Sequence, residues 1–206
     1  GGYSLTGSNA QKTKEYRSGI GRFWQGDSPF DSEVLDRYLS LVRSFNDGDA
    51  LENYPGSPWF SMASMKAHGV RADQLFLHEI HPTDSKLLEE FIGRDRQVHI
   101  INKDSFKHAV GLLPPTQKRG LVLIDPPYEI KQDYQSVVSF IQRAYKRFAT
   151  GTYAIWYPVV QRERIIRMQR DLQASGIRRI QRFEIAVAPD SEEFGMTASG
   201  MIVINP

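Results

Sequence analysis

The residues best suited to chemistry are Asp125-Pro126-Pro127-Tyr128, which stand together directly after an apolar run. That run, Leu121 to Ile124, has the composition of a strand buried in a sheet. Because ligands of open α/β sheets bind beyond the carboxyl ends of the strands, we expect the motif at a binding edge. The alternative is a purely structural turn in which Tyr128 covers the core.

The motif suits a reaction at an exocyclic aromatic amine, whose lone pair is delocalised into the ring. Two acceptors directed at the N–H bonds favour a pyramidal nitrogen and return the lone pair to it. The Asp125 carboxylate and the Pro126 carbonyl are such acceptors, and the fixed φ of proline stiffens the turn. Tyr128 would stack on the ring, and the released proton would pass to Asp125 or to water. A base inside a duplex must first be flipped out.

Composition excludes several classes of protein. The 206 residues include 26 Lys and Arg, 24 Asp and Glu, 40% hydrophobic residues and no cysteine. Without cysteine there are no disulfides, thiolate metal sites or cysteine nucleophiles, and we expect a cytoplasmic protein. No apolar run approaches the roughly 20 residues that cross a bilayer. No grouping of histidines and acids predicts a metal site.

From residue 71 onward, short apolar runs alternate with longer amphipathic segments. This pattern predicts an α/β fold with a doubly wound, mostly parallel sheet. Gly151 and Gly176 stand where helix ends favour positive φ. The expected strands are Gln74 to Ile80, Gln97 to Asn102, Gly120 to Asp125, Thr152 to Tyr157, Arg179 to Ala188 and Gly200 to Asn205. The expected helices are Asp84 to Ile92, Tyr134 to Phe148 and Val160 to Ala174.

Residues 8–70 have a different pattern. Glu33 to Phe45 has helical spacing of apolar residues, and no strand is apparent in the region. We interpret residues 8–70 as a helical insertion subdomain, and residues 1–7 with 71–206 as the main α/β domain. The chain opens on Gly1-Gly2 without the strand that usually precedes such glycines, so we expect a fragment that lacks its first strand.

The sequence resembles the RlmJ family of class I S-adenosylmethionine-dependent methyltransferases. The resemblance rests on the Asp-Pro-Pro-Tyr motif and on longer blocks across the whole chain. These blocks are Tyr54 to Pro58, Glu79 to Pro82, Arg119 to Glu129, Tyr145 to Gly151, Trp156 to Val160 and Gly195 to Pro206. The resemblance implies a Rossmann-like sheet with an antiparallel last strand and a helical insertion. It also implies methylation of an adenine amine in large-subunit (23S) ribosomal RNA by a monomer.

Carboxylates after two other expected strands are candidate cofactor ligands. Glu79 is placed to accept hydrogen bonds from both ribose hydroxyls of an adenosyl group, and the resemblance points to the same residue. The alternative is a surface ion pair with a nearby Arg or Lys. Asp104 and the backbone N–H of Ser105 suit the edge of the cofactor's adenine, although the family has glycine in place of Ser105. Asp104 could also cap the helix that follows.

The resemblance implies further cofactor contacts. Gly1 and Gly2 correspond to the tail of the family's first cofactor loop, and Asp125 lies beside the cofactor as well as the substrate. Ser57 matches a family serine near the cofactor, but its sequence context is equally that of a turn or a helix cap.

A basic segment bears on the nature of the substrate. Ten basic and two acidic residues lie between Arg143 and Arg182, which suits a phosphate backbone or a solvated helix face. Two other functions stay open. One is methylation of adenine in DNA or a role in the use of external DNA, although no helix-turn-helix or zinc finger is recognisable. The other is a catalytically silent RNA-binding module.

Overall fold

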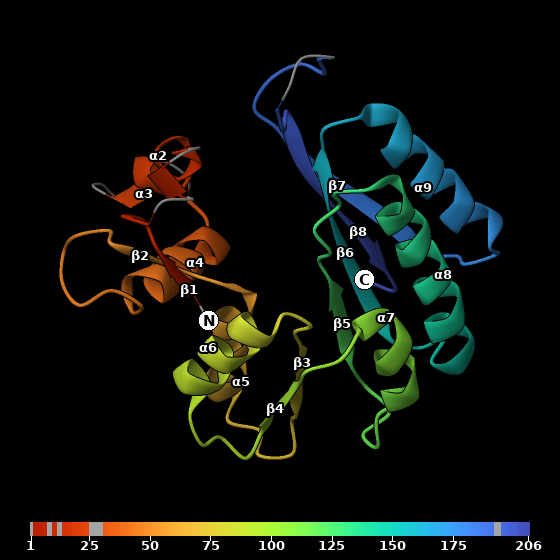
Figure 1. Ribbon diagram of the computed structural model, residues 1–206, viewed down its shortest axis with the longest axis horizontal. Helices are drawn as coiled ribbons and strands as arrows, with labels where there is room; N and C mark the ends of the chain where they lie inside the picture. Colours follow the sequence, from red (N-terminus) through yellow and green to blue (C-terminus); the bar gives the residue numbers. More distant parts are fainter. Residues whose placement is uncertain (1, 8–9, 12–13, 25–30, 192–194) are drawn as a thin grey trace. The chain divides into compact units, whose positions relative to one another are not determined.

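The computed structural model describes residues 2–7, 10–11, 14–24, 31–191 and 195–206. Contacts within the chain divide it into two compact units, Gly1–Lys103 (the first unit) and Asp104–Pro206 (the second unit). Each unit is described by itself (Figure 1). This division after Lys103 differs from the predicted insertion subdomain of residues 8–70, which stays a prediction.

A small antiparallel strand pair and several helices form the amino-terminal part of the first unit. Strand β1 (Gly2–Ser4) pairs with β2 (Asn53–Pro55), and the rings of Tyr3 and Tyr54 pack together 5.7 Å apart. The expectation that residues 8–70 contain no strand is therefore wrong. A three-residue strand whose partner lies some fifty residues away leaves no local periodicity. The helices here are α2 (Glu15–Ser18), α3 (Gly21–Trp24), α4 (Glu33–Arg43) and α5 (Ser57–His68).

The rest of the first unit is a strand–helix–strand segment. Strands β3 (Leu75–His78) and β4 (Val98–Ile101) pair in parallel, and α6 (Pro82–Ile92) connects them. The two strands lie inside the ranges predicted from the sequence. Helix α6 begins two residues earlier than predicted, because Pro82 suits the first turn of a helix, where its missing N–H costs nothing.

A four-stranded sheet forms the centre of the second unit. Its strand order is β5-β6-β8-β7 (Figure 1). Strand β5 (Leu121–Ile124) runs parallel to β6 (Thr152–Val159), whereas β8 (Ala198–Ile204) runs antiparallel to both β6 and β7 (Ile180–Ala186). The predicted antiparallel last strand is thus confirmed. Two short helical segments, α7 (Ser105–His108) and η1 (Ala109–Leu112), precede β5.

Two long helices, α8 (Lys131–Arg147) and α9 (Arg162–Ala174), cover one face of this sheet (Figure 1). Their apolar sides and the facing strand residues form a single buried cluster, in which Ile141, Tyr153 and Ile165 are fully buried. Side chains on the other face of the strands, such as Leu121 and Ile185, are exposed. Burial alternates with a period of two in β5 and β8, whereas the central strand β6 has buried residues on both faces.

Two glycines were expected to have positive φ at helix ends. Gly176 does so, with φ of 78°, and follows Ser175, the C-cap of α9. For Gly151 the expectation is wrong, because its φ is not in that region. A Cβ at position 151 would instead overlap the ring of Phe148, so close packing explains this glycine.

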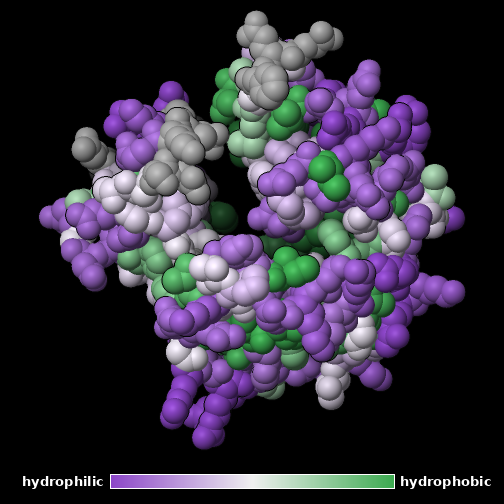
Figure 2. Space-filling view, in the orientation of Figure 1, coloured by the Kyte–Doolittle hydropathy of each residue, from purple (hydrophilic) through white to green (hydrophobic). Residues whose placement is uncertain are grey.

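The surface visible in Figure 2 is mostly hydrophilic over the helices of the second unit. None of the helices in the described ranges has the length and apolar character needed to span a bilayer.

Candidate functional site

A sharp turn presents the Asp-Pro-Pro-Tyr motif at the carboxyl end of β5. Ile124, the last residue of the strand, is buried, the next residue Asp125 is exposed, and Tyr128 is buried again. Tyr128 has φ of 54°, a conformation that is uncommon for a residue with a bulky side chain. Such backbone strain persists only where surrounding contacts hold it.

The contacts of Tyr128 explain how the turn is held. Its hydroxyl donates a hydrogen bond to the backbone carbonyl of Trp156 in β6, at 2.6 Å. Its ring lies 4.7 Å from the ring of Tyr134 in α8 and 6.3 Å from that of Trp156. Burial raises the pKa of Tyr128 above its ordinary range, so the hydroxyl keeps its proton. Sequence reasoning singled out neither Tyr134 nor Trp156, since each looks like an ordinary core aromatic.

This packing bears on the expected role of Tyr128. The side chain is only 6% exposed, so its ring is part of the core cluster, as the structural alternative required. In this arrangement Tyr128 anchors the turn to the core of the second unit. That it also stacks on a substrate base stays a prediction.

Asp125 has the surroundings expected of a hydrogen-bond acceptor. The side chain reaches the surface, yet desolvation by the protein around it raises the pKa of its carboxyl group. No cation among the described residues pairs with it. A carboxylate that is partly desolvated and not committed to an ion pair is available to a ligand.

Asp104 and Ser105 lie in the same unit as the motif. Asp104 is the N-cap of α7, where its side chain accepts a hydrogen bond of 3.0 Å from the backbone N–H of Phe106. The Nζ atom of Lys107 lies 3.1 Å from its other oxygen. Desolvation raises the pKa of Asp104, but the bonds from Lys107 and Phe106 outweigh it, and the net shift is downward. The predicted capping role is confirmed, and a cofactor contact stays a prediction.

Glu79 follows β3 directly, as expected. Its Oε1 atom accepts a hydrogen bond from the backbone N–H of His81 at 2.8 Å, and its backbone carbonyl accepts one from Asn102 Nδ2 at 2.9 Å. Within the described parts of the chain Glu79 makes no ion pair with Arg or Lys, which disfavours the alternative that it is part of a surface ion pair. Asn102, which ties the end of β4 to Glu79, was not singled out from the sequence, because its partner is far away in the chain.

The remaining candidates belong to the first unit or fall outside the structure. Gly1 lies outside the described residues. Gly2 lies in β1, where a Cβ would overlap the ring of Phe45, so packing alone requires a glycine there. Ser57 is the first residue of α5, and the helix cap suggested for it is wrong because Gly56 occupies that position. Their contacts with a cofactor stay predictions.

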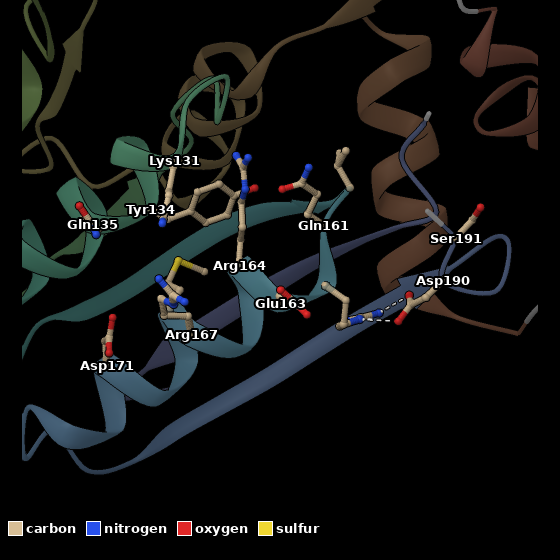
Figure 3. A pocket seen from close by; sticks show the side chains of 13 residues that line it. Lys131, Tyr134, Gln135, Gln161, Glu163, Arg164, Arg167, Asp171, Asp190 and Ser191 are labelled. Atoms are coloured by element: carbon tan, nitrogen blue, oxygen red, sulfur yellow. Dashed lines mark hydrogen bonds and ion pairs between the residues drawn. The ribbon is translucent and has the colours of Figure 1, made fainter. Parts of the chain in front are cut away.

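A pocket of about 720 Å³ lies in the second unit, and none of the four motif residues is among its lining. Its walls are the start of α8, α9 from Arg162 to Asp171 and the segment that follows β7 (Figure 3). Tyr134, which packs on Tyr128, lines this pocket. No group of three or more metal-ligating side chains occurs in the described ranges.

Sequence comparisons agree over the whole chain. The family described as "Ribosomal RNA large subunit methyltransferase D, RlmJ" matches residues 1–206. A protein of Escherichia coli (strain K12) is 49% identical over 206 residues, which are all of this chain and 71% of that protein. A protein of Haemophilus influenzae is 46% identical over 208 residues, covering all of this chain and 72% of that protein. Both are named "Ribosomal RNA large subunit methyltransferase J".

Solved structures support the same architecture. A crystal structure of a protein from Legionella pneumophila str. Philadelphia 1 is 33% identical, with a TM-score of 0.87, over all of this chain and 73% of that one. A methyltransferase from Pyrococcus furiosus is 14% identical, with a TM-score of 0.52, over 97% of this chain and 99% of that one. The second likeness shows the fold alone, which is the α/β fold of methyltransferases.

Proposed function

This chain belongs to the RlmJ family of ribosomal RNA large subunit methyltransferases, and on that premise we propose that it methylates the exocyclic amine of an adenine in 23S ribosomal RNA with S-adenosylmethionine as donor. The observation that carries this proposal is the turn after β5. It presents a carboxylate without an ion pair to solvent while Tyr128 holds the backbone in place. A protein with this substrate works in the cytoplasm.

The chemistry follows from the acceptors of the turn. The Asp125 carboxylate and the Pro126 carbonyl accept hydrogen bonds from the two N–H groups of the amine and make its lone pair available. Positioning and electrostatics dominate such a step, and no covalent enzyme intermediate is needed. As the nitrogen gains a methyl group it loses one proton, to Asp125 or to water. The pKa of Asp125 is raised, which favours proton acceptance by this carboxyl.

We propose that Glu79 and Asp104 accept hydrogen bonds from the adenosyl group of the cofactor. Glu79 stands at the carboxyl end of a parallel strand with one carboxylate oxygen outside its bond to His81, as recognition of ribose hydroxyls requires. Asp104 and the adjacent backbone suit the adenine edge. S-adenosylmethionine supplies an electrophilic methyl group when bound. The protein then has only to seat both partners and exclude water.

The test is a comparison of ribosomal RNA from a deletion strain with RNA from strains complemented by the full-length protein or its Asp125→Asn variant. Mass spectrometry should show that one methyladenine of 23S RNA is lost on deletion, returns with the wild type and does not return with the variant. A mark that returns with the variant supports the silent RNA-binding module. Loss of methyladenine from DNA alone supports the DNA alternative.

A further inference from the structure

The pocket of the second unit has the size of a ligand site and is lined by charged side chains of both signs. Its volume of about 720 Å³ lies within the usual range for such sites. The basic side chains of the lining are Lys131 of α8 and Arg162, Arg164 and Arg167 of α9, and the acidic ones are Glu163 and Asp171 of α9 and Asp190 after β7. Which of these charges are already neutralised within the protein decides what the pocket can bind.

Arg162 is fully engaged inside the protein. Its guanidinium group donates to Glu184 at 2.8 Å and to both carboxylate oxygens of Asp190, at 2.7 Å and 2.8 Å. Figure 3 draws the two bonds to Asp190 as dashed lines. The hydroxyl of Tyr157 donates to the same oxygen of Glu184 at 2.9 Å. These bonds raise the pKa of Arg162 and tie the segment after β7 to the start of α9. Arg162 therefore builds a wall of the pocket and contributes little free charge to it.

Arg164 is held differently. Its guanidinium carbon lies 5.9 Å from the centre of the Tyr134 ring, and Figure 3 shows the two side chains next to each other. No acid of the described chain segments forms an ion pair with Arg164. A guanidinium that rests on an aromatic face is oriented before a ligand arrives and keeps its donors for that ligand.

Lys131 adds a second cation at the same end of the pocket. It is the first residue of α8, is exposed, and stands three positions after Tyr128. The positive end of the α9 dipole also lies here, since Arg164 is the third residue of that helix. The acidic Glu163 and Asp171 line the pocket too, and Asp171 lies farther along α9 (Figure 3). Two cations thus stand by Tyr134, because Lys131 precedes it by three positions in α8 and Arg164 packs on its ring.

Tyr134 connects this end of the pocket to the reaction centre. The centre of its ring lies 4.7 Å from that of Tyr128 in the motif, and the guanidinium group of Arg164 lies over the same ring. A nucleotide whose base reaches Asp125 carries its phosphates with it, and these need cations close to the turn. Arginine and lysine are the side chains that bind phosphate oxygens best.

We propose that Lys131 and Arg164 bind the sugar-phosphate backbone next to the target adenine, so that this pocket is an RNA-contact site. This inference rests on the proposed function and specifies how its substrate is held. The contacts read no sequence, because phosphate contacts position a nucleic acid and base contacts specify it. They bring a single strand or a flipped nucleotide into register with the motif.

The test compares two double variants of the full-length protein that remove the same charges. Lys131→Gln/Arg164→Gln alters the pocket, whereas Lys118→Gln/Arg119→Gln alters two exposed residues that precede β5, at the other end of that strand. Binding of a 23S RNA transcript is measured at several salt concentrations. S-adenosylmethionine binding is measured by calorimetry, and methyl transfer is measured over a range of RNA concentrations.

For the pocket variant we expect RNA affinity to fall by about 10- to 100-fold. The slope of log K against log salt should become smaller by about 1.5 to 2, because two phosphate contacts are lost. KM for RNA should rise with little change in kcat, and S-adenosylmethionine affinity should be unchanged. The control variant should show wild-type RNA affinity and a wild-type slope.

Two results would overturn the proposal. One is wild-type affinity and slope in the pocket variant, and the other is equal weakening by both variants, which would mean a diffuse electrostatic effect. If the double variant does not fold, Lys131→Gln alone should lower the slope by about 1. Failure of the proposed function would be seen separately, as a wild-type protein that transfers no methyl group to RNA.

Discussion

The hydroxyl of Tyr128 lies 2.6 Å from the backbone carbonyl of Trp156 and donates a hydrogen bond to it. This bond joins the turn after β5 to the neighbouring strand β6, and it holds Tyr128 at a φ that its side chain otherwise disfavours. The carboxylate of Asp125, three positions earlier, therefore stands on a rigid support. Rigid placement of acceptors is what activation of a poorly nucleophilic amine requires.

Replacing Tyr128 by Phe should lower both stability and turnover. The Trp156 carbonyl loses its donor, so we expect a loss of about 1–2 kcal/mol in the free energy of unfolding. The turn also becomes less well positioned, and kcat should fall by about tenfold. Denaturant titration and methyl-transfer assays measure the two effects.

Tyr153→Phe is the matched control for this change. Its hydroxyl makes an equivalent bond of 2.7 Å to the Phe148 carbonyl, away from the motif. It should lose similar stability with no change in kcat. Equal losses of kcat in both variants would show that the Tyr128 bond acts on activity only through general stability.

Replacing Asp125 by Asn should separate activity from stability. The amide presents an N–H donor in place of one carboxylate oxygen, so we expect methyl transfer to fall by about 10²- to 10³-fold. Desolvation raises the pKa of Asp125, which means that the ionised form is disfavoured in the folded protein. The variant should therefore be at least as stable as the wild type near neutral pH. Thermal melting at pH 7 checks this, with Glu129→Gln, an exposed neighbour, as the control.

Methyl transfer and stability of the wild type should both depend on pH through the protonation of Asp125. Because the pKa of Asp125 is raised in the fold, this carboxyl takes up its proton at a higher pH than an exposed aspartate, for which about 3.9 is usual. Methyl transfer should fall on acidification as the acceptor is lost. The destabilisation caused by the ionised group should also disappear as pH falls through the raised pKa.

Two measurements check this dependence. The pH profile of kcat/KM reports the free enzyme, and carbon NMR of the Asp125 carboxyl reports the group directly. The stability difference between Asp125→Asn and the wild type should shrink at low pH. A measured pKa at or below that of an exposed aspartate would contradict the prediction.

Replacing Glu79 by Gln should weaken cofactor binding. A charged hydrogen bond to a ribose hydroxyl is worth about 1.5–3 kcal/mol, so the dissociation constant for S-adenosylmethionine should rise by about 10- to 100-fold. Glu90→Gln, on the exposed side of α6 in the same unit, is the control and should leave it unchanged. Calorimetric titration of both variants decides between a ligand role for Glu79 and a local role through its bond to His81.

Most helices and strands were predictable from the sequence. The positions of their ends show which local signals made this possible and which were missing. Helix α9 ends at Ala174 as predicted, because a left-handed glycine follows it. Helix α8 begins at Lys131, three residues before the prediction, since its first turn is polar and apolar spacing cannot detect it. Strand β2 was missed for the corresponding reason, as its pairing with β1 is non-local.

By itself the sequence determined the strand and helix pattern, the motif at the end of β5 and the resemblance to a methyltransferase family. Each of these depends on consecutive or periodically spaced residues, which can be recognised without the fold. Tertiary structure alone decided that Tyr128 points into the core, that Arg162 is neutralised by Glu184 and Asp190, and that Arg164 rests on Tyr134. These contacts join side chains that are distant in the chain, and their energies depend on distance and burial, which no local pattern encodes.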